Sequence, residues 1–290
     1  MKQKFDIGII GAGLSGLTLG NSLLSKKIKN FILIEKNTHI KNDKTYSFWS
    51  GPGLFDIKKS FSVKPKKEWS QIEIKVKNKS YKIDLGSYRY ACYSSESILD
   101  ELYKKITKER IKVERGHSIN HVKKNQDGWE IKLKNKKILL KNVIDSRPNK
   151  IFDDKYPSLK QVFVGSEIIS NQDIFDENVV TLMDFSESKK NVIFTYILPF
   201  SKNKALIETT FFSSEINFKQ VEKIHNLTLK KFDIKGLALH PLNFLISFQE
   251  YYYFQKNKST KKYQPPSPAP QKTSLLKLLI FSFLCGYYIN

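Results

Sequence analysis

The N-terminal 35 residues contain a strand, a glycine-rich loop, a helix and a second strand in direct succession. The loop is GAGLSG at residues 11–16, immediately after the apolar run FDIGII. Its glycines stand where a tight turn, close approach of the backbone to a pyrophosphate, and close packing of helix on strand require them. The N–H groups at the start of such a helix attract phosphates. The stretch predicts a dinucleotide-binding βαβ unit, with Gly11, Gly13 and Gly16 against the cofactor.

A carboxylate ends the second strand of this unit. Glu35 closes the run NFILIE, about 20 residues beyond Gly16, where the acid of dinucleotide-binding proteins accepts ribose hydroxyls. We therefore expect Glu35 to bind the cofactor. The alternative is a glycine-rich turn that binds no ligand.

Residues 119–145 help to identify the dinucleotide. Alternating apolar residues, including Trp129 and Ile131, flank two polar turns and predict a three-stranded meander that leads into the strand NVID. This resembles the glutathione-reductase type of flavoprotein, in which a strand end beyond the meander approaches FAD. The resemblance implies that Asp145 lies near the cofactor. No second βαβ pattern follows the first, as a nicotinamide dehydrogenase would require, so FAD is favoured.

The remaining patterns divide the chain into three parts. Residues 1–150 are expected to form the FAD-binding domain, with an inserted hairpin (71–85) and amphipathic helix (94–111). Residues 151–235 contain mostly strands and are expected to form an antiparallel substrate domain. Residues 236–290 are expected to be an irregular tail, either non-native or in contact with a membrane. The predicted fold class is α/β: a Rossmann-like domain of the glutathione-reductase type with an antiparallel sheet domain.

The chain is strongly basic, with a net charge of +22. Its lysines are spread through strands and turns, so nucleic acid is not expected as a partner. An anionic membrane surface is the better explanation, because each basic residue near one contributes about 1 kcal/mol. Cys92 and Cys285 form no metal-binding or disulfide pattern, so no metal site is expected. No signal-peptide pattern precedes the glycine loop, which predicts a cytoplasmic protein at the membrane surface.

Six phrases follow one another along the chain from residue 6 to about residue 218: DIGIIGAGLSGL, KTYSFW, VIDSRP, QVFVGSEI, LMDF and ALIETTFF. In this order they resemble the lycopene cyclase family of carotenoid-forming flavoproteins. The resemblance implies an enzyme that closes the end groups of lycopene, or a related acyclic carotenoid, into β-ionone rings without net redox change. It also implies FAD held in its reduced form to stabilise a carbocation, with NAD(P)H as the source of electrons.

Such a cyclisation needs a strong proton donor in a dry pocket, because an alkene is a very weak base. Glu208 stands within the apolar run ALIETTFF, where burial would keep its carboxyl neutral. The resemblance maps the family's acid onto this residue. The strand period of two puts Glu208 on one face with Leu206, Thr210 and Phe212. The alternative is an outward-facing glutamate on a half-exposed strand.

Two more charged residues are candidates. Asp184 in LMDF shares a predicted strand face with Val180 and Leu182, so it is expected to point inward and orient Glu208 or stabilise positive charge. A turn former at a strand end is the alternative. Arg89 is a candidate for the flavin or a phosphate, or else a surface arginine. Aromatic residues that could stabilise a cation, or serve as plain core, are Phe48, Trp49, Phe194, Tyr196 and Phe211.

The sequence also departs from the family pattern. Thr209 follows Glu208 where the family often has a second acid, and the chain after Gly236 does not match the family's second flavin-contacting segment. The resemblance therefore implies a C-terminally truncated or altered member. Two alternatives stay open: an FAD-dependent monooxygenase or isoprenoid reductase of the same fold, and an inactive remnant.

Overall fold

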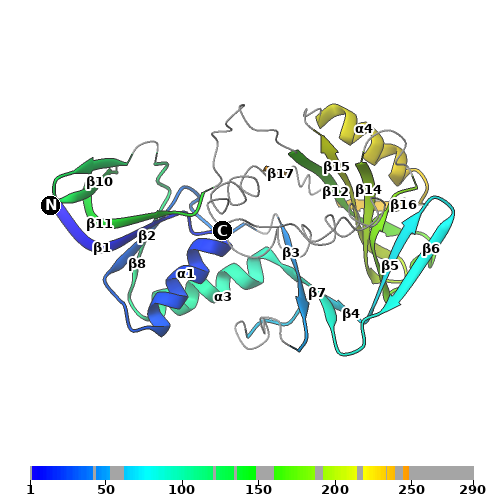
Figure 1. Ribbon diagram of the computed structural model, residues 1–290, viewed down its shortest axis with the longest axis horizontal. Coiled ribbons are helices and arrows are strands. Elements are labelled where there is room, and N and C mark those ends of the chain that lie inside the picture. Colours follow the sequence, from blue (N-terminus) through cyan, green and yellow to red (C-terminus); the bar gives the residue numbers. More distant parts are fainter. Residues whose placement is uncertain are drawn as a thin grey trace, which may run out of the picture.

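The computed structural model describes residues 2–41, 44–52, 62–119, 122–133, 136–147, 160–186, 192–213, 218–232, 234–238 and 244–247. Within these ranges the strands form three sheets (Figure 1). A six-stranded sheet forms the N-terminal half, an eight-stranded sheet the other half, and a three-stranded sheet lies between them.

The N-terminal half contains the predicted βαβ unit. Strand β1 (Lys2–Ile10) runs parallel to β2 (Phe31–Glu35), and helix α1 (Leu14–Ser25) connects them. Helix α3 (Ser95–Lys108) packs beside α1. The side chain of Ser94 caps α3 by accepting a hydrogen bond from the N–H of Ser97. The amphipathic helix predicted from periodicity is thus confirmed.

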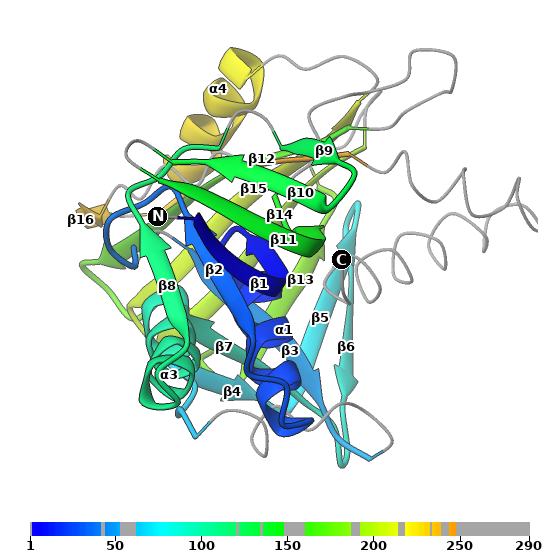
Figure 2. The same ribbon diagram turned by 90° about the vertical axis from the view of Figure 1, so that its left-hand side faces the viewer.

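The six-stranded sheet has the order β8-β2-β1-β11-β10-β9 (Figure 2). Strands β9, β10 and β11 form the predicted antiparallel meander, and β11 then runs parallel to β1. This register pairs Ile10 with Asp145, so the ends of β1 and β11 lie side by side. Besides β1 and β2, this sheet contains β8 (Lys112–Arg115), β9 (Lys123–Asn125), β10 (Gly128–Lys132) and β11 (Lys137–Asp145).

The eight-stranded sheet has the order β16-β12-β15-β14-β13-β5-β6, with β17 also paired to β12. Helix α4 (Phe218–Leu229) packs on one face, against β12 and β15. Strands make up most of the described residues between 160 and 213, as expected for this part of the chain. The bounds are β5 (Gln71–Val76), β6 (Lys79–Asp84), β12 (Lys160–Ser170), β13 (Val179–Asp184), β14 (Val192–Ser201), β15 (Lys204–Ser213), β16 (Ile234–Ala238) and β17 (Phe244–Ser247).

Two expectations about this sheet were wrong in detail. The hairpin β5–β6 was assigned to the first domain, but β5 pairs with β13 and so belongs to the second sheet. That pairing is parallel, so the sheet is not purely antiparallel. Part of the expected irregular tail is ordered into strands, since β16 and β17 both pair with β12. The rest of the tail, residues 248–290, lies outside the described residues.

The three-stranded sheet consists of β3 (Thr45–Ser50), β7 (Arg89–Ser94) and β4 (Lys67–Trp69). Alternate side chains of β7 belong to different cores. Ala91 and Tyr93 pack with α1 and α3, whereas Tyr90 and Cys92 pack with the eight-stranded sheet. The central strand therefore joins the two halves of the protein (Figure 1).

Candidate functional site

The glycine loop has the geometry of a phosphate-binding turn. Gly11 has φ +97°, and a Cβ on Gly16 would lie 2.0 Å from the carbonyl oxygen of Gly11. A side chain at either position would therefore strain or block the turn. By contrast, a Cβ on Gly13 would meet no atom within 4 Å. The backbone at Gly13 faces open space into which a ligand can approach closely.

The start of α1 faces the same space. Gly13 is its N-cap, no side chain caps this end, and the first turn carries no acidic residue. The positive end of the helix dipole is therefore not neutralised by the helix's own residues, which favours a bound anion.

Glu35 lies against this loop. It is 8% exposed, and its Oε2 accepts a hydrogen bond of 2.7 Å from the N–H of Ala12. Its Oε1 accepts a second bond, of 2.9 Å, from the N–H of Asn37. A carboxylate has about four lone-pair sites, so two bonds leave capacity for ribose hydroxyls. The residues present therefore fit a dinucleotide whose phosphates lie on the loop.

The end of β11 forms another wall beside the loop. Ser146 donates from its N–H to the carbonyl oxygen of Ile10 and from its Oγ to the same oxygen, both at 2.9 Å. The guanidinium of Arg147 binds both carboxylate oxygens of Asp145, at 2.8 and 2.6 Å, and lowers the pKa of that carboxyl. Asp145 is thus an ion-paired carboxylate next to the glycine loop. Sequence patterns alone do not single out Ser146 and Arg147, although both lie in the phrase VIDSRP.

Arg89 is bonded elsewhere. Its Nη1 donates to the carbonyl oxygens of Gly86 and Tyr88, each at 2.6 Å, in the turn that precedes β7. This arrangement is that of a surface arginine that stabilises its own turn. A role at the flavin stays a prediction for Arg89.

Glu208 lies in the middle of β15, on the face of the sheet opposite α4. Its cross-strand partners are Gly165 on β12 and Tyr196 on β14. Leu206 and Phe212, two and four residues away on the same face, belong to the apolar cluster beside β7. The predicted face of β15 is therefore confirmed for its apolar members.

The surroundings of Glu208 disfavour its charged form. The side chain is half-buried and closely surrounded by protein, and this desolvation raises the pKa of its carboxyl from 4.5 to about 7. Thr210 Oγ1 donates a hydrogen bond of 3.2 Å to Glu208 Oε1, which opposes part of that rise. A cross-strand Cβ at Gly165 would lie 3.6 Å from Glu208 Cγ, so the glycine keeps neighbouring space free of a side chain. Glu208 can therefore carry a proton near neutral pH.

Aromatic rings flank this acid. The hydroxyl of Tyr196 is hydrogen-bonded to the hydroxyl of Tyr90, which comes from the three-stranded sheet. Burial raises the pKa of both tyrosines, so both stay neutral. The rings of Tyr90 and Trp49 are in edge contact, with centroids 4.9 Å apart. Tyrosine rings and a neutral carboxyl thus share an apolar environment.

The five aromatic candidates divide between different places. Phe48 contacts Tyr93 in the N-terminal core, with ring centroids 5.9 Å apart. Phe211 packs against α4, on the face away from Glu208. The three that pack in or against the apolar cluster beside Glu208 are Trp49, Phe194 and Tyr196.

The expected position of Asp184 was wrong. A bulge between Thr181 and Asp184 inserts one extra residue into β13, so the alternation of faces is broken. Asp184 pairs with Thr195, which in turn pairs with Thr209 on β15. Cross-strand partners share a face, so Asp184 is on the face opposite to that of Glu208.

The contacts of Asp184 are those of a turn former. Its Oδ1 accepts a hydrogen bond of 2.9 Å from the N–H of Ser186 and another from the Ser186 hydroxyl. This is the alternative considered for a strand-end aspartate. A catalytic role stays a prediction that this geometry does not support.

A buried histidine that sequence patterns do not single out lies behind Glu208, on the other face of the sheet. His225 on α4 is 2% exposed, and burial lowers its pKa to about 4. Its Nε2 lies 2.9 Å from Ser166 Oγ, and its Nδ1 lies 3.1 Å from Thr209 Oγ1. The signal available in the sequence is a lone histidine among the apolar positions of α4, whose buried residues also include Val221 and Leu229.

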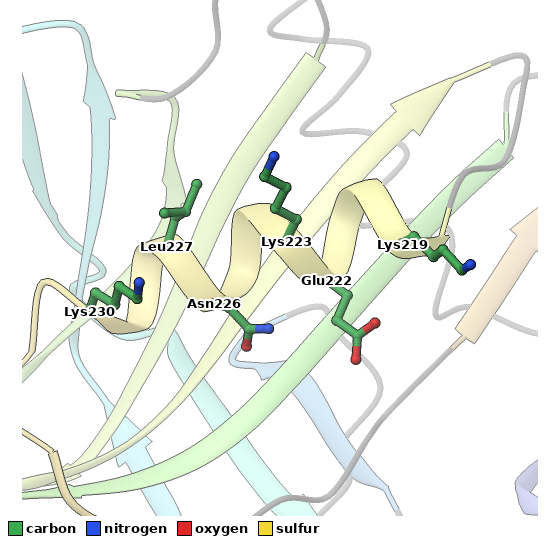
Figure 3. A pocket seen from close by; sticks show the side chains of 6 residues that line it. All are labelled: Lys219, Glu222, Lys223, Asn226, Leu227 and Lys230. Carbon is green, nitrogen blue, oxygen red and sulfur yellow. The ribbon is translucent and has the colours of Figure 1, made fainter.

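The outward side of α4 carries a separate hollow of about 370 Å³ (Figure 3). It is away from both the glycine loop and Glu208, on the side of the helix that faces away from the sheet. Its lining is mostly basic and polar: Lys219, Glu222, Lys223, Asn226, Leu227 and Lys230. No helix in the described part of the chain is long and apolar enough to cross a membrane.

The sheet order, the glycine loop and the meander together define a flavoprotein fold with a Rossmann-like FAD-binding half. The chain belongs to the lycopene cyclase family: the profile described as "Lycopene cyclase protein" matches residues 6–239. No curated protein matches the sequence. The predicted fold and family are thus confirmed.

Solved structures share this fold. A geranylgeranyl bacteriochlorophyll reductase-like protein from Thermoplasma acidophilum matches with a TM-score of 0.57 and 14% identity, covering 85% of this chain and 66% of that one. The halogenase PltM, in complex with phloroglucinol and FAD, matches with a TM-score of 0.56 and 14% identity, covering 84% of this chain and 59% of that one. A flavoprotein/dehydrogenase from Cytophaga hutchinsonii matches with a TM-score of 0.53 and 12% identity, covering 85% of this chain and 67% of that one. This chain spans only about three fifths to two thirds of these structures.

Proposed function

We propose that this protein is a lycopene cyclase-like flavoenzyme that closes the acyclic end groups of lycopene, or a related acyclic carotenoid, into β-ionone rings. The observation that carries the proposal is Glu208, a carboxyl on an apolar sheet face whose pKa is raised to about 7. Membership of the lycopene cyclase family supports the substrate class.

In the proposed mechanism, the neutral carboxyl of Glu208 donates its proton to the terminal double bond of the polyene. The resulting carbocation is attacked by the neighbouring double bond of the same molecule, and a six-membered ring closes. Loss of a proton from the ring then restores a double bond. One proton is added and one is lost, so the product is an isomer of the substrate.

The groups around Glu208 support this chemistry. Desolvation keeps the Glu208 carboxyl protonated near neutral pH, so the proton is present when the polyene binds. A carbocation formed beside the carboxylate would offset part of the cost of charging it in this apolar site. The faces of Tyr196 and Trp49 offer negative π density to a cation nearby. Water must be kept from the cation, and the apolar cluster of this face provides that exclusion.

The cofactor site follows the same assignment. Gly11, Gly13 and Gly16 would hold the pyrophosphate of FAD, Glu35 a ribose, and Asp145 would lie beside it. When bound in its reduced form, with NAD(P)H as the source of electrons, FAD supplies electrostatic stabilisation for a carbocation.

The partner surface is proposed to be an anionic membrane on the cytoplasmic side, because the substrate is a hydrocarbon and the chain carries a net charge of +22. Three lysines, Lys219, Lys223 and Lys230, line the outward hollow of α4 and contribute to this charge. Nucleic acid is not a proposed partner.

Expression in cells that accumulate lycopene tests the proposal. The wild-type chain should shift the pigment to cyclic products, and Glu208→Gln should abolish the shift while the purified protein keeps its flavin absorbance. NAD(P)H consumed in proportion to an oxidised or reduced product would instead indicate a monooxygenase or isoprenoid reductase. A colourless protein without any product would indicate an inactive remnant.

A further inference from the structure

The imidazole of His225 lies behind the cross-strand pair of Gly165 and Glu208, the proposed acid. Gly165 on β12 and Glu208 on β15 are cross-strand partners. Ser166 follows Gly165, and Thr209 follows Glu208, so both hydroxyl side chains lie on the opposite face of the sheet. His225 contacts one with each ring nitrogen, at 2.9 and 3.1 Å. The ring therefore links the two strands directly behind Glu208.

This link is deeply buried. Ser166 is 1% exposed and Thr209 is fully buried, and His225 is 2% exposed. A neutral imidazole donates from one nitrogen and accepts at the other, so the two hydroxyls must take opposite roles. Loss of either partner would leave a buried polar group unsatisfied, which costs about 1–3 kcal/mol. The three groups therefore hold one another in a single arrangement.

The sheet needs a fixed point at this position. A glycine in the interior of a strand weakens the strand, because it adds backbone freedom and contributes no side chain to packing. Gly165 is the cross-strand partner of Glu208, so this weakening falls at the position where the acid is attached. Neighbouring contacts of α4 with β12 and β15 are apolar, through Val221 and Leu229. Apolar contacts have no preferred direction, whereas hydrogen bonds fix the relative orientation of the groups that they join.

We propose that His225 is a positioning residue, which holds the Gly165–Glu208 pair in place from the opposite face of the sheet through its bonds to Ser166 and Thr209. It touches neither substrate nor cofactor. The proposal rests on the proposed function only in taking Glu208 as the acid.

The first test measures Glu208 itself and needs no turnover. The carboxyl C=O stretch of Glu208, identified by its loss in Glu208→Gln, is titrated by infrared difference spectroscopy in Thr209→Val and His225→Leu proteins. If the link is cut, the backbone at Glu208 loosens and water reaches the carboxyl. The midpoint should then fall by at least half a pH unit from the wild-type value.

A second readout uses catalysis. Thr209→Val and His225→Leu should each lower kcat about tenfold, equivalent to about 1.4 kcal/mol, with KM changed less than twofold. The double variant should be no worse than His225→Leu, because both changes cut the same link. His225→Asn, which can retain the Thr209 bond, and His225→Gln, which can retain the Ser166 bond, should each recover only part of the loss.

The matched control is Thr228→Val. Thr228 is also buried on α4, but its hydroxyl donates to the carbonyl of Ile224 within the helix, at 3.0 Å. This variant should leave the Glu208 midpoint and kcat unchanged. If Thr209→Val folds and keeps both at wild-type values, the proposal is overturned. If wild-type protein lacks cyclase activity, the proposed function fails, and the infrared titration still decides whether His225 positions Glu208.

Discussion

Glu208 and Tyr196 stand side by side on one face of the eight-stranded sheet, as cross-strand partners of the β14–β15 ladder. The Tyr196 hydroxyl is bonded to Tyr90, and the hydroxyl that Glu208 accepts from is that of Thr210. The cross-strand neighbour of Glu208 is thus an uncharged aromatic residue. A cationic residue at this position would instead form an ion pair and lower the pKa of the carboxyl.

Replacing Glu208 by glutamine should stabilise the protein at alkaline pH. The carboxyl has a pKa of about 7 when folded against an ordinary 4.5, so the unfolded chain loses this proton first as pH rises. Wild-type stability therefore falls between pH 4.5 and 7, and Glu208→Gln escapes this loss. At pH 8 the variant should gain up to about 3 kcal/mol in the free energy of unfolding, with no gain at pH 4. Urea unfolding at the two pH values measures this, and equal stabilities at pH 8 would count against a desolvated carboxyl.

Replacing Thr210 by valine should extend cyclisation to higher pH. The Thr210 hydroxyl stabilises the charged carboxylate, so its removal raises the pKa of Glu208 further. Since the protonated acid is the active form, the wild-type rate should fall as pH passes through about 7. In Thr210→Val that fall should occur at higher pH. A pH–rate profile of both proteins measures the shift, and a fall at lower pH would contradict the assignment of Glu208 as the donor.

His225 should make the protein sensitive to mild acid. Its pKa is about 4 when folded against an ordinary 6.5, so the unfolded chain takes up a proton first as pH falls. Stability should therefore decrease between pH 6.5 and 4, by up to about 3 kcal/mol. His225→Gln should lower stability overall but flatten this slope. The slope of unfolding free energy against pH is the quantity to compare, and an unchanged slope would mean that His225 is not the group responsible.

Alanine substitutions at two glycines of the loop should affect different properties, folding at Gly16 and cofactor binding at Gly13. Gly16→Ala would place a methyl group 2.0 Å from the Gly11 carbonyl oxygen, so the fold itself should be destabilised. Gly13→Ala meets no protein atom within 4 Å, so stability without cofactor should change by about 1 kcal/mol or less. FAD binding, followed by flavin fluorescence, should weaken in Gly13→Ala. A Gly13→Ala protein that binds FAD as tightly as wild type would show that the phosphates lie elsewhere.

Asp184→Asn should retain cyclisation within about twofold, because Asp184 lies on the opposite face from Glu208 and its amide replacement can still accept from Ser186. Glu208→Gln, assayed in the same cells, is the comparison. Loss of product in both variants would restore Asp184 to the catalytic group.

The local parts of this structure could be predicted from the sequence. The glycine loop, β15 and α3 follow from short-range spacing, and each spacing has one dominant structural solution. The side of β15 on which Glu208 lies also follows, because the strand is regular over its whole length.

What could not be predicted depends on pairing between distant segments. The bulge before Asp184 moves that residue to the other face, and a strict period of two does not reveal it. The β5–β6 hairpin joins the second sheet only because it pairs with β13, far along the chain. The link through His225 requires α4, β12 and β15 to come together, although each of its three members is unremarkable in its own segment.

The β7 strand has a consequence for how the protein unfolds. Tyr90 and Cys92 belong to one core and Ala91 and Tyr93 to the other, so neither core can be opened without disrupting a strand of its neighbour. The Trp69 indole, which donates to the Pro199 carbonyl at 3.1 Å, adds a second connection. The two halves should therefore melt in a single cooperative transition, and a ligand that stabilises the glycine-loop half raises the melting temperature of the Glu208 half by the same equilibrium. Mass action, rather than any moving part, couples the two sites.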